Sequence, residues 1–234
     1  MIEYQLKVIA HQDDFVVLEK PEDVSFHDED MVGSGLFSII KAQLKLQYAL
    51  NELYPVHRLD KMTSGLIIVA KNNATAQAFQ QQFQQHKVEK YYLAIAQGKP
   101  KKKQGLIKGD MEKSRRGMWK LMRTVNNPAI SQFYSYNIAP NKRLYLIKPH
   151  SGKTHQIRVA LNSIGVPILG DPLYNSNSGT DRGYLHAFAI TFTLHGKSYQ
   201  YCLAPNTGVE FNNSTTLDTI KELTPPWQLA WPKI

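Results

Sequence analysis

Apolar residues recur at two different spacings along the chain, and these spacings predict which segments are strands and which are helices. Four short apolar runs are typical of strands: residues 15–20, 66–70, 90–98 and 143–149. The run at 66–70 (LIIVA) has no polar position, so we expect both faces of that strand to be buried. Residues 190–204 predict a hairpin that turns at His195-Gly196.

Three further segments place apolar residues at helical spacing: residues 34–50, 72–87 and 151–165. Ser34 is a candidate N-cap for the first helix, and Gly165 is expected to end the third. Strands and helices follow one another without the regular alternation of a parallel α/β protein. We therefore expect an α+β fold with a mixed or mostly antiparallel sheet and flanking helices.

The chain of 234 residues contains no long Pro/Gly/Ser linker and no internal repeat, which predicts a single domain over residues 1–234. Residues 99–128 are basic, weakly periodic and interrupted by glycine, and are interpreted as an arm or hairpin loop. Residues 206–234 form a polar tail with one short predicted helix.

The charge is strongly basic. Twenty-eight Lys and Arg residues face nineteen Asp and Glu residues, giving a net charge of +9 and favouring a polyanionic partner. Three clusters concentrate this charge, at residues 99–103, 113–116 and 141–143. Each cluster taken alone is also compatible with an ordinary solvated surface, but Met118 and Trp119 add a stacking surface beside the second one. Cations next to an aromatic ring suit looped or single-stranded RNA.

Several other classes of site are disfavoured. Cys202 is the only cysteine, which excludes an internal disulfide and a multi-cysteine zinc site and fits a reducing, cytoplasmic compartment. No apolar run approaches the length of a membrane span, so no membrane partner is expected. SGKT at 151–154 lacks the earlier glycine of a phosphate-binding loop, and the scattered histidines lack metal-ligand spacing. We expect no cofactor and no metal.

The densest cluster of reactive side chains is HRLD at residues 57–60. Asp60 lies between Arg58 and Lys61, immediately before the apolar run at 66–70. One interpretation is a surface ion pair of little energetic value. The other is a carboxylate at the edge of the core that neighbouring cations keep ionised for catalysis. The cluster alone leaves both open.

Five segments in order resemble the RluA-type family of pseudouridine synthases. HRLDKMTSGL at 57–66 is similar to the family pattern HRLDxxTSGL, and FVVLEKPEDVSFH at 15–27 is similar to KPxGxxxH. KYYLA at 90–94 matches KxYxA, residues 150–174 are similar to GRTHQIRxHLxxxGxPIxGDxxY, and LHA follows at 185–187. The resemblance covers residues 15–187, most of the chain.

The resemblance implies a single catalytic domain with a bent sheet that isomerises uridine to pseudouridine in ribosomal or transfer RNA. It implies no metal and no cofactor. No protein partner is implied, and we expect a monomer. Because only a few residues precede the first motif, we also expect no separate N-terminal RNA-binding domain of the kind found in some relatives. Asp60 matches the catalytic aspartate, which either attacks C1′ or takes the 2′ proton. Tyr92 matches the tyrosine that stacks on the base and is placed to take the C5 proton. Arg158 matches the arginine that pairs with the aspartate.

The same resemblance suggests which residues contact the substrate. Ile157 matches the apolar residue that packs on uracil, and Arg58 matches a residue inserted into the space that the flipped uridine leaves. His57 is expected to support the same loop or to contact the RNA backbone. The predicted substrate-binding set is His57, Arg58, Thr63, His155, Gln156 and Ile157.

Three residues depart from the family pattern. Asp23 replaces a usual glycine, which predicts a different turn there, while Lys153 replaces the common arginine and Ala160 a frequent histidine. None removes a predicted catalytic group. The alternative function is a non-catalytic RNA-binding or RNA-chaperone module that retains the fold, although such a module has no need of Asp60. A metal-dependent nuclease or deaminase is disfavoured by the absence of metal-ligand spacing.

Overall fold

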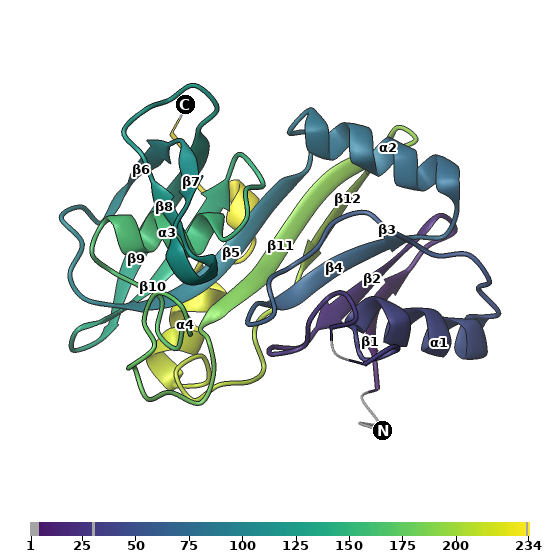
Figure 1. Cartoon of the computed structure of the whole chain (residues 1–234), viewed down its shortest axis with the longest axis horizontal. Coiled ribbons are helices and arrows are strands. Elements are labelled where there is room, and N and C mark those ends of the chain that lie inside the picture. The colour runs from purple at the N-terminus through teal and green to yellow at the C-terminus, as the bar shows by residue number, and fades with distance from the viewer. Residues whose placement is uncertain (1–4, 30, 233) are drawn as a thin grey trace.

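The computed structural model describes residues 5–29, 31–232 and 234, and its framework is one ten-stranded sheet (Figure 1). The main strands, in their order across the sheet, are β1 (Lys7–His11), β2 (Phe15–Lys20), β4 (Ser64–Ala70), β11 (Leu185–Leu194), β5 (Glu89–Gln97), β10 (Lys142–Pro149), β9 (Ala129–Ala139) and β6 (Gln104–Gly109). β3 (Tyr54–Pro55) is added beside β4, and β12 (Lys197–Cys202) beside β11. The β4–β11 pair is parallel and the other pairs are antiparallel. The predicted mixed-sheet α+β class is confirmed.

Four α-helices flank the sheet: α1 (Leu36–Tyr48), α2 (Asn73–Gln84), α3 (Gln156–Ser163) and α4 (Ser214–Glu222). Figure 1 shows α1 and α2 beside the half that contains β1, β2 and β4, and α3 and α4 beside the other half. Alternate side chains of β4 enter two different cores, Ile67 with the α1 residues and Ile68 with Phe79 of α2. The whole of β4 is buried, as its unbroken apolar run predicts.

The start of α1 differs from the prediction. Its N-cap is Gly35, which has no side chain to cap the helix, and the Ser34 hydroxyl donates to the Met31 carbonyl instead. The Asp28 carboxylate accepts hydrogen bonds from the backbone N–H of Gly35 at 2.7 Å and from the Ser38 hydroxyl at 3.1 Å. Capping by a residue seven positions upstream leaves no local sequence signature, and the prediction of Ser34 as the N-cap is wrong.

α3 is shorter than its apolar pattern predicts, because residues 151–155 form a turn and the helix begins at Gln156. Its predicted end is confirmed. Gly165 has φ of 77°, and the N–H of the next residue, Val166, donates to the Leu161 carbonyl at 3.1 Å. This is the arrangement in which glycine commonly terminates a helix.

The basic segment 99–128 divides into two parts. Residues 104–109 join the main sheet as β6, whereas β7 (Met111–Lys113) and β8 (Trp119–Leu121) form a separate two-stranded hairpin. A 3-10 turn at Arg115–Gly117 connects these two strands. The hairpin of residues 111–121 therefore forms its own small sheet, separate from the main one.

The C-terminal part of the chain packs against the sheet. The hairpin of β11 and β12 turns at His195-Gly196 as predicted, with positive φ at both residues. The predicted short helix is α4, capped by the Asn213 side chain, and a 3-10 turn follows at Pro226–Gln228. Trp231 then packs near Tyr91 and Tyr134. None of the helices in residues 5–29, 31–232 and 234 is long and apolar enough to cross a membrane.

A buried histidine makes the fold sensitive to acid. His186 of β11 is 1% exposed; its Nε2 lies 2.8 Å from the Leu203 carbonyl and its Nδ1 2.8 Å from the Ser64 hydroxyl, which accepts from Arg182. Burial lowers the pKa of His186 to about 3. Between pH 6.5 and 3 the unfolded chain therefore binds a proton that the folded chain does not, and stability falls as pH falls.

We expect His186→Gln to flatten the acid side of the stability profile. A histidine whose pKa is lowered in the folded state reduces the free energy of unfolding by about 1.4 kcal/mol for each pH unit below its unfolded pKa. Urea unfolding between pH 5.5 and 4.5 should show a slope shallower by about that amount in the variant. His195→Gln, in the exposed turn, is the matched control. Equal slopes for wild type and His186→Gln would contradict the prediction.

Candidate active site

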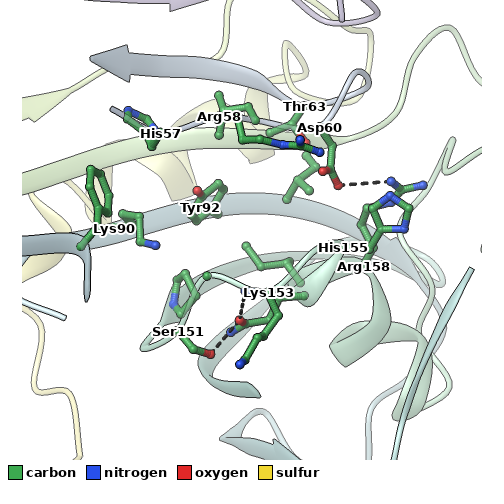
Figure 2. Close-up of a pocket in the computed structure, with 17 residues that line it drawn as sticks. His57, Arg58, Asp60, Thr63, Lys90, Tyr92, Ser151, Lys153, His155 and Arg158 are labelled. Carbon is green, nitrogen blue, oxygen red and sulfur yellow. Dashed lines mark hydrogen bonds and ion pairs between the residues drawn. The ribbon is translucent and has the colours of Figure 1, made fainter. Parts of the chain in front are cut away.

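A cleft of about 270 Å³ opens between the loop before β4, the strand β5 and the turn that leads into α3 (Figure 2). All nine residues predicted for the site line it: His57, Arg58, Asp60, Thr63, Tyr92, His155, Gln156, Ile157 and Arg158. They come from segments up to about a hundred positions apart, and Asp60 and Arg158 are linked by an ion pair across 98 positions. The structure thus brings the predicted set together in one place, while the individual roles remain predictions.

Asp60 lies at the mouth of this cleft, in the turn that precedes β4. Its side chain is 21% exposed, and Oδ2 accepts a hydrogen bond from Arg158 Nη1 at 3.2 Å. In the described part of the chain the other carboxylate oxygen has no hydrogen-bond partner. Asp60 is therefore held from one side and open to a ligand on the other.

The close approach of two strands fixes the loop that carries Asp60. A Cβ atom on Gly65 would lie 2.3 Å from the Ala187 carbonyl oxygen, and Gly65 has φ of 112°, so only glycine fits there. From the other side, the fully buried Lys20 donates to the carbonyls of Pro21, Lys61 and Thr63 at 2.7 to 2.9 Å. Glycine lets β4 start directly against β11, and Lys20 ties down the turn just after Asp60.

Arg158 is held by a second carboxylate that sequence reasoning did not single out. Asp171, which is fully buried, accepts from Arg158 Nε at 2.7 Å and from Nη2 at 2.8 Å. The same Asp171 accepts from the backbone N–H of Leu173 and Tyr174, and the Tyr174 ring lies 5.2 Å from the guanidinium. This bidentate pair fixes the guanidinium plane and leaves Nη1 directed at Asp60.

The charge state of Arg158 follows from these contacts. Burial alone would lower the pKa of Arg158, but Asp171 and Asp60 more than offset it and raise the pKa above its usual value. The available signal for this role was the GDPLY sequence at 170–174, which contains both Asp171 and Tyr174 and ends the segment that resembles the family. The pairing itself is tertiary and no spacing in the sequence reveals it.

Tyr92 lies on β5 with its ring against the cleft. Tyr91 faces the opposite side, where its hydroxyl donates to Glu89 at 2.7 Å, in agreement with the prediction that these neighbours point apart. Burial raises the pKa of Tyr92, and the charge of Asp60 raises it further. The phenol therefore stays protonated at neutral pH. This state suits stacking and hydrogen-bond donation, whereas accepting the C5 proton would first require loss of the phenolic proton.

Gln156 shapes the turn before α3 rather than offering free polar atoms. Its Oε1 accepts from the Ser151 hydroxyl and the Lys153 N–H, and its Nε2 donates to the Ile130 carbonyl and the Ser131 hydroxyl. The amide thereby has all its hydrogen-bonding capacity in use. These bonds give Gln156 a role in holding the cleft wall, and its contact with the substrate stays a prediction.

His57 likewise has a partner within the protein. Its Nε2 accepts from the backbone N–H of Ile68 at 2.9 Å, just beyond the point where β3 stops pairing with β4. Burial lowers the pKa of His57 to about 3, with a further contribution from the charge of Lys90, so the ring is neutral. This agrees with its predicted role in supporting the loop, and a contact with RNA stays a prediction.

The remaining predicted residues differ in exposure. Thr63 is 2% exposed and belongs to the turn, and Ile157 is 7% exposed at the base of the cleft. Arg58 is exposed and makes no hydrogen bond or ion pair with the residues that the structure describes. His155 Nδ1 lies 3.2 Å from the Tyr174 hydroxyl. Of the predicted set, Arg58 is the one with a free cationic head beside the opening.

Asp23, which stands where the family pattern usually has glycine, adopts a backbone conformation typical of glycine. Asp23 has φ of 57°, the left-handed conformation that glycine adopts most readily and that aspartate tolerates better than most residues. The backbone at Asp23 thus has a conformation that the usual glycine also adopts, and a different turn at this position stays a prediction.

Within the described residues, no three His, Cys, Asp or Glu side chains gather as metal ligands would.

Comparison with known proteins decides the family. Residues 14–163 match the family model described as RNA pseudouridylate synthase. The chain belongs to the RNA pseudouridylate synthase family. It is therefore an RNA-modifying isomerase of the type that converts uridine to pseudouridine.

The relatives of this pseudouridine synthase include both short and longer chains. An uncharacterized RNA pseudouridine synthase from Haemophilus influenzae is 43% identical over 93% of this chain and 95% of its own. Ribosomal large subunit pseudouridine synthase C from Vibrio vulnificus is 32% identical over 82% of this chain, but this chain spans only 62% of it. Synthase D from Borreliella burgdorferi is 30% identical, with 64% of its length covered.

Solved structures support the fold. Human RNA pseudouridylate synthase domain containing 1 superposes with a TM-score of 0.74 at 22% identity, covering 98% of this chain and 97% of its own. Human RNA pseudouridylate synthase domain containing 4 gives a TM-score of 0.73 at 21% identity over 87% of this chain and 90% of its own. The pseudouridine-synthase-like architecture predicted from the sequence is confirmed.

Proposed function

We propose that this synthase isomerises one or more uridines in ribosomal RNA, with Asp60 as its catalytic carboxylate. The observation that carries the proposal is the carboxylate of Asp60, held at the mouth of the cleft by an arginine that Asp171 fixes in place. The names of the Vibrio and Borreliella relatives, which specify the large ribosomal subunit, favour ribosomal over transfer RNA.

The chemistry requires the uracil to leave the sugar and return by another atom. Cleavage of the N1–C1′ bond leaves the electron pair on uracil, and a new bond then forms between C5 and C1′. The C5 proton is lost, and N1 gains a proton, so the net reaction is an isomerisation that consumes no co-substrate. Asp60 acts at the sugar, either on C1′ or on the 2′ proton, and Tyr92 and Ile157 hold the base between them.

We also propose that a single chain carries out the reaction as a cytoplasmic monomer with one catalytic domain. The support for one domain is that a single ten-stranded sheet includes segments from Lys7 to Cys202. Light scattering coupled to size-exclusion chromatography should give a mass near 26.6 kDa. A mass of twice that value at assay concentrations would contradict the monomer.

The substrate class can be tested directly with RNA from cells that lack the gene. Purified protein is incubated with large-subunit ribosomal RNA, small-subunit ribosomal RNA or bulk transfer RNA, and nucleosides are separated after complete digestion. We expect new pseudouridine in ribosomal RNA. New pseudouridine in transfer RNA alone would overturn the assignment to ribosomal RNA and retain the enzyme class.

The hairpin of residues 111–121 is our candidate for RNA contact outside the cleft. The Trp119 N–H donates to the Tyr174 hydroxyl at 2.8 Å, and this hydroxyl also lies 3.2 Å from His155 Nδ1, so the hairpin is attached to the active-site wall. Arg115 and Arg116 are exposed at its turn. Lys101 and Lys102 instead lie near Ile164, beyond the end of α3 remote from Asp60.

We therefore expect charge reversal to weaken RNA binding more at Arg115 and Arg116 than at Lys101 and Lys102. Arg115→Glu with Arg116→Glu should weaken RNA binding about tenfold and reduce the slope of log affinity against log salt by about 1 to 2, because each phosphate contact contributes about 0.9. Lys101→Glu with Lys102→Glu is the matched control and should change the slope less. Filter binding at several salt concentrations measures both. An unchanged slope in the arginine variant would exclude the hairpin from the RNA interface.

A further inference from the structure

Lys90 is a cation inside the cleft that the proposed mechanism has not yet used. It lies two positions before Tyr92 on β5, so both side chains face the cleft, and Figure 2 shows its ammonium nitrogen directed inward. Lys90 is mostly buried, and neither a carboxylate nor a carbonyl within the described residues accepts a hydrogen bond from it. Its Nζ lies 5.6 Å from the centre of the Phe83 ring. Burying an unpaired charge is costly, so an unmet anionic partner is expected.

The protein groups around Lys90 do not neutralise it. The adjacent Glu89 is bound to Lys148 at 2.7 Å and to the Tyr91 hydroxyl, and His57 is neutral. The titratable and charged groups that line the surroundings of Lys90 are His57, Arg58, Asp60, His86, Glu89, Tyr92, Lys148, His150, Lys153, His155 and Arg158. Of the two acids, Glu89 is paired with Lys148, and Asp60 is paired with Arg158 toward the other end of the cleft (Figure 2). The substrate is therefore the remaining source of negative charge near Lys90.

The position of Lys90 selects which part of the substrate it meets. Asp60 and Lys90 lie toward opposite ends of the cleft, with Tyr92 between them (Figure 2). Alternate residues of a strand are about 6.6 Å apart, which is comparable with the length of uracil including its carbonyl oxygen. A base stacked on Tyr92 with its sugar at Asp60 therefore places its far edge at Lys90. Phosphates stay hydrated near the surface, where the exposed Arg58 is available.

The chemistry of uracil makes that far edge negative in the intermediate. The electron pair left by cleavage of the N1–C1′ bond is delocalised onto O2 and O4. A half-turn about the C6–N3 axis exchanges N1 with C5 and, by the same motion, O4 with O2. A carbonyl oxygen that carries negative charge thus faces the end remote from the sugar both before and after the rotation.

We propose that the Lys90 ammonium binds this remote carbonyl oxygen, O4 before the rotation and O2 after it, and stabilises the detached uracil anion. This inference rests on the proposed function. Lys90 is thereby a catalytic residue of the oxyanion-stabilising kind, and it retains the free base without a covalent bond.

The test compares Lys90→Met with Lys87→Met, an exposed lysine of the preceding turn, in single-turnover release of tritium from C5-labelled ribosomal RNA. We expect the rate at saturating RNA to fall about 10²- to 10³-fold in Lys90→Met, as for loss of an oxyanion donor, and to stay unchanged in Lys87→Met. RNA affinity should be unchanged in both. The melting temperature of Lys90→Met should not fall, because an unpaired buried charge has been removed.

The pH profile supplies a readout that a structural role would not produce. Burial lowers the pKa of Lys90 to about 8, so the wild-type rate should decline as the pH rises above that value. The arginine in Lys90→Arg stays charged, so the rate of this variant should not decline above pH 8.

The possible failures are distinguishable. An active wild type with an equally fast Lys90→Met would overturn this inference alone. A Lys90→Met variant that binds RNA more weakly but turns over normally at saturation would show a phosphate contact and would also overturn it. A wild type inactive on every RNA pool would overturn the proposed function, and this inference with it.

Discussion

Asp60→Asn should abolish pseudouridine formation while leaving the fold and RNA binding intact. Asparagine keeps the shape of the side chain and one oxygen for Arg158 Nη1, but it supplies no negative charge for the sugar. Loss of a group that acts covalently or as a base costs about 10⁴-fold or more in rate. Pseudouridine in digested RNA should therefore fall below detection under single-turnover conditions in which the wild type reaches completion.

The partial exposure of Asp60 lets activity be compared without a large change in stability. Its side chain is partly solvated, and Arg158 keeps both bonds to Asp171 when the Asp60 charge is lost, so the melting temperature should change little. Asp218→Asn is the matched control, since Asp218 is exposed on α4 and pairs with Lys221. Turnover by a homogeneous Asp60→Asn preparation at more than a hundredth of the wild-type rate would exclude Asp60 as the catalytic carboxylate.

Asp171→Asn should damage both stability and activity. The substitution breaks a bidentate pair in which Arg158 is 4% exposed and Asp171 fully buried. Removing one partner of such a pair leaves a buried charge uncompensated, which costs about 3 to 5 kcal/mol. Urea unfolding at pH 7 should show this loss. The freed guanidinium no longer points at Asp60, and a misplaced catalytic group costs on the order of 10²-fold in rate.

The two effects of Asp171→Asn can be separated. Activity is measured well below the melting temperature of the variant, where circular dichroism shows it folded, and Asp218→Asn again serves as the control. We expect a lower single-turnover rate with largely retained RNA affinity. A variant that is as stable as the wild type would contradict the buried pairing, and a folded variant with the wild-type rate would show that Asp171 does not position Arg158.

The sequence predicted elements wherever the signal was local. The unbroken apolar run of β4, the turn at His195-Gly196 and the glycine stop of α3 all follow from residues adjacent in the chain. The cap of α1 was missed because Asp28 reaches it from seven positions away. The start of α3 was misplaced because Gln156 bonds to the preceding residues and to β9, which holds residues 151–155 out of the helix.

The site residues also divide into those that a sequence motif reveals and those whose role depends on contacts between distant segments. Asp60, Tyr92 and Arg158 could be identified because each sits in a motif that resembles the family, and the cleft contains all three. Lys20 and Asp171 were not identified, since their roles exist only through contacts with loops far away in sequence. Lys90 lies inside a recognised motif, but its lack of a partner is a property of the folded chain.

The measurement that tests the central claim most directly is tritium release from ribosomal RNA labelled at uridine C5, by the wild type and by Asp60→Asn. Formation of pseudouridine removes the C5 hydrogen, so release reports completed isomerisation. The account predicts release by the wild type to a defined plateau and none above background by Asp60→Asn, with similar RNA affinity for both. Equal release by the two proteins would contradict the assignment of Asp60. No release by the wild type from ribosomal RNA, with binding intact, would contradict the proposed function.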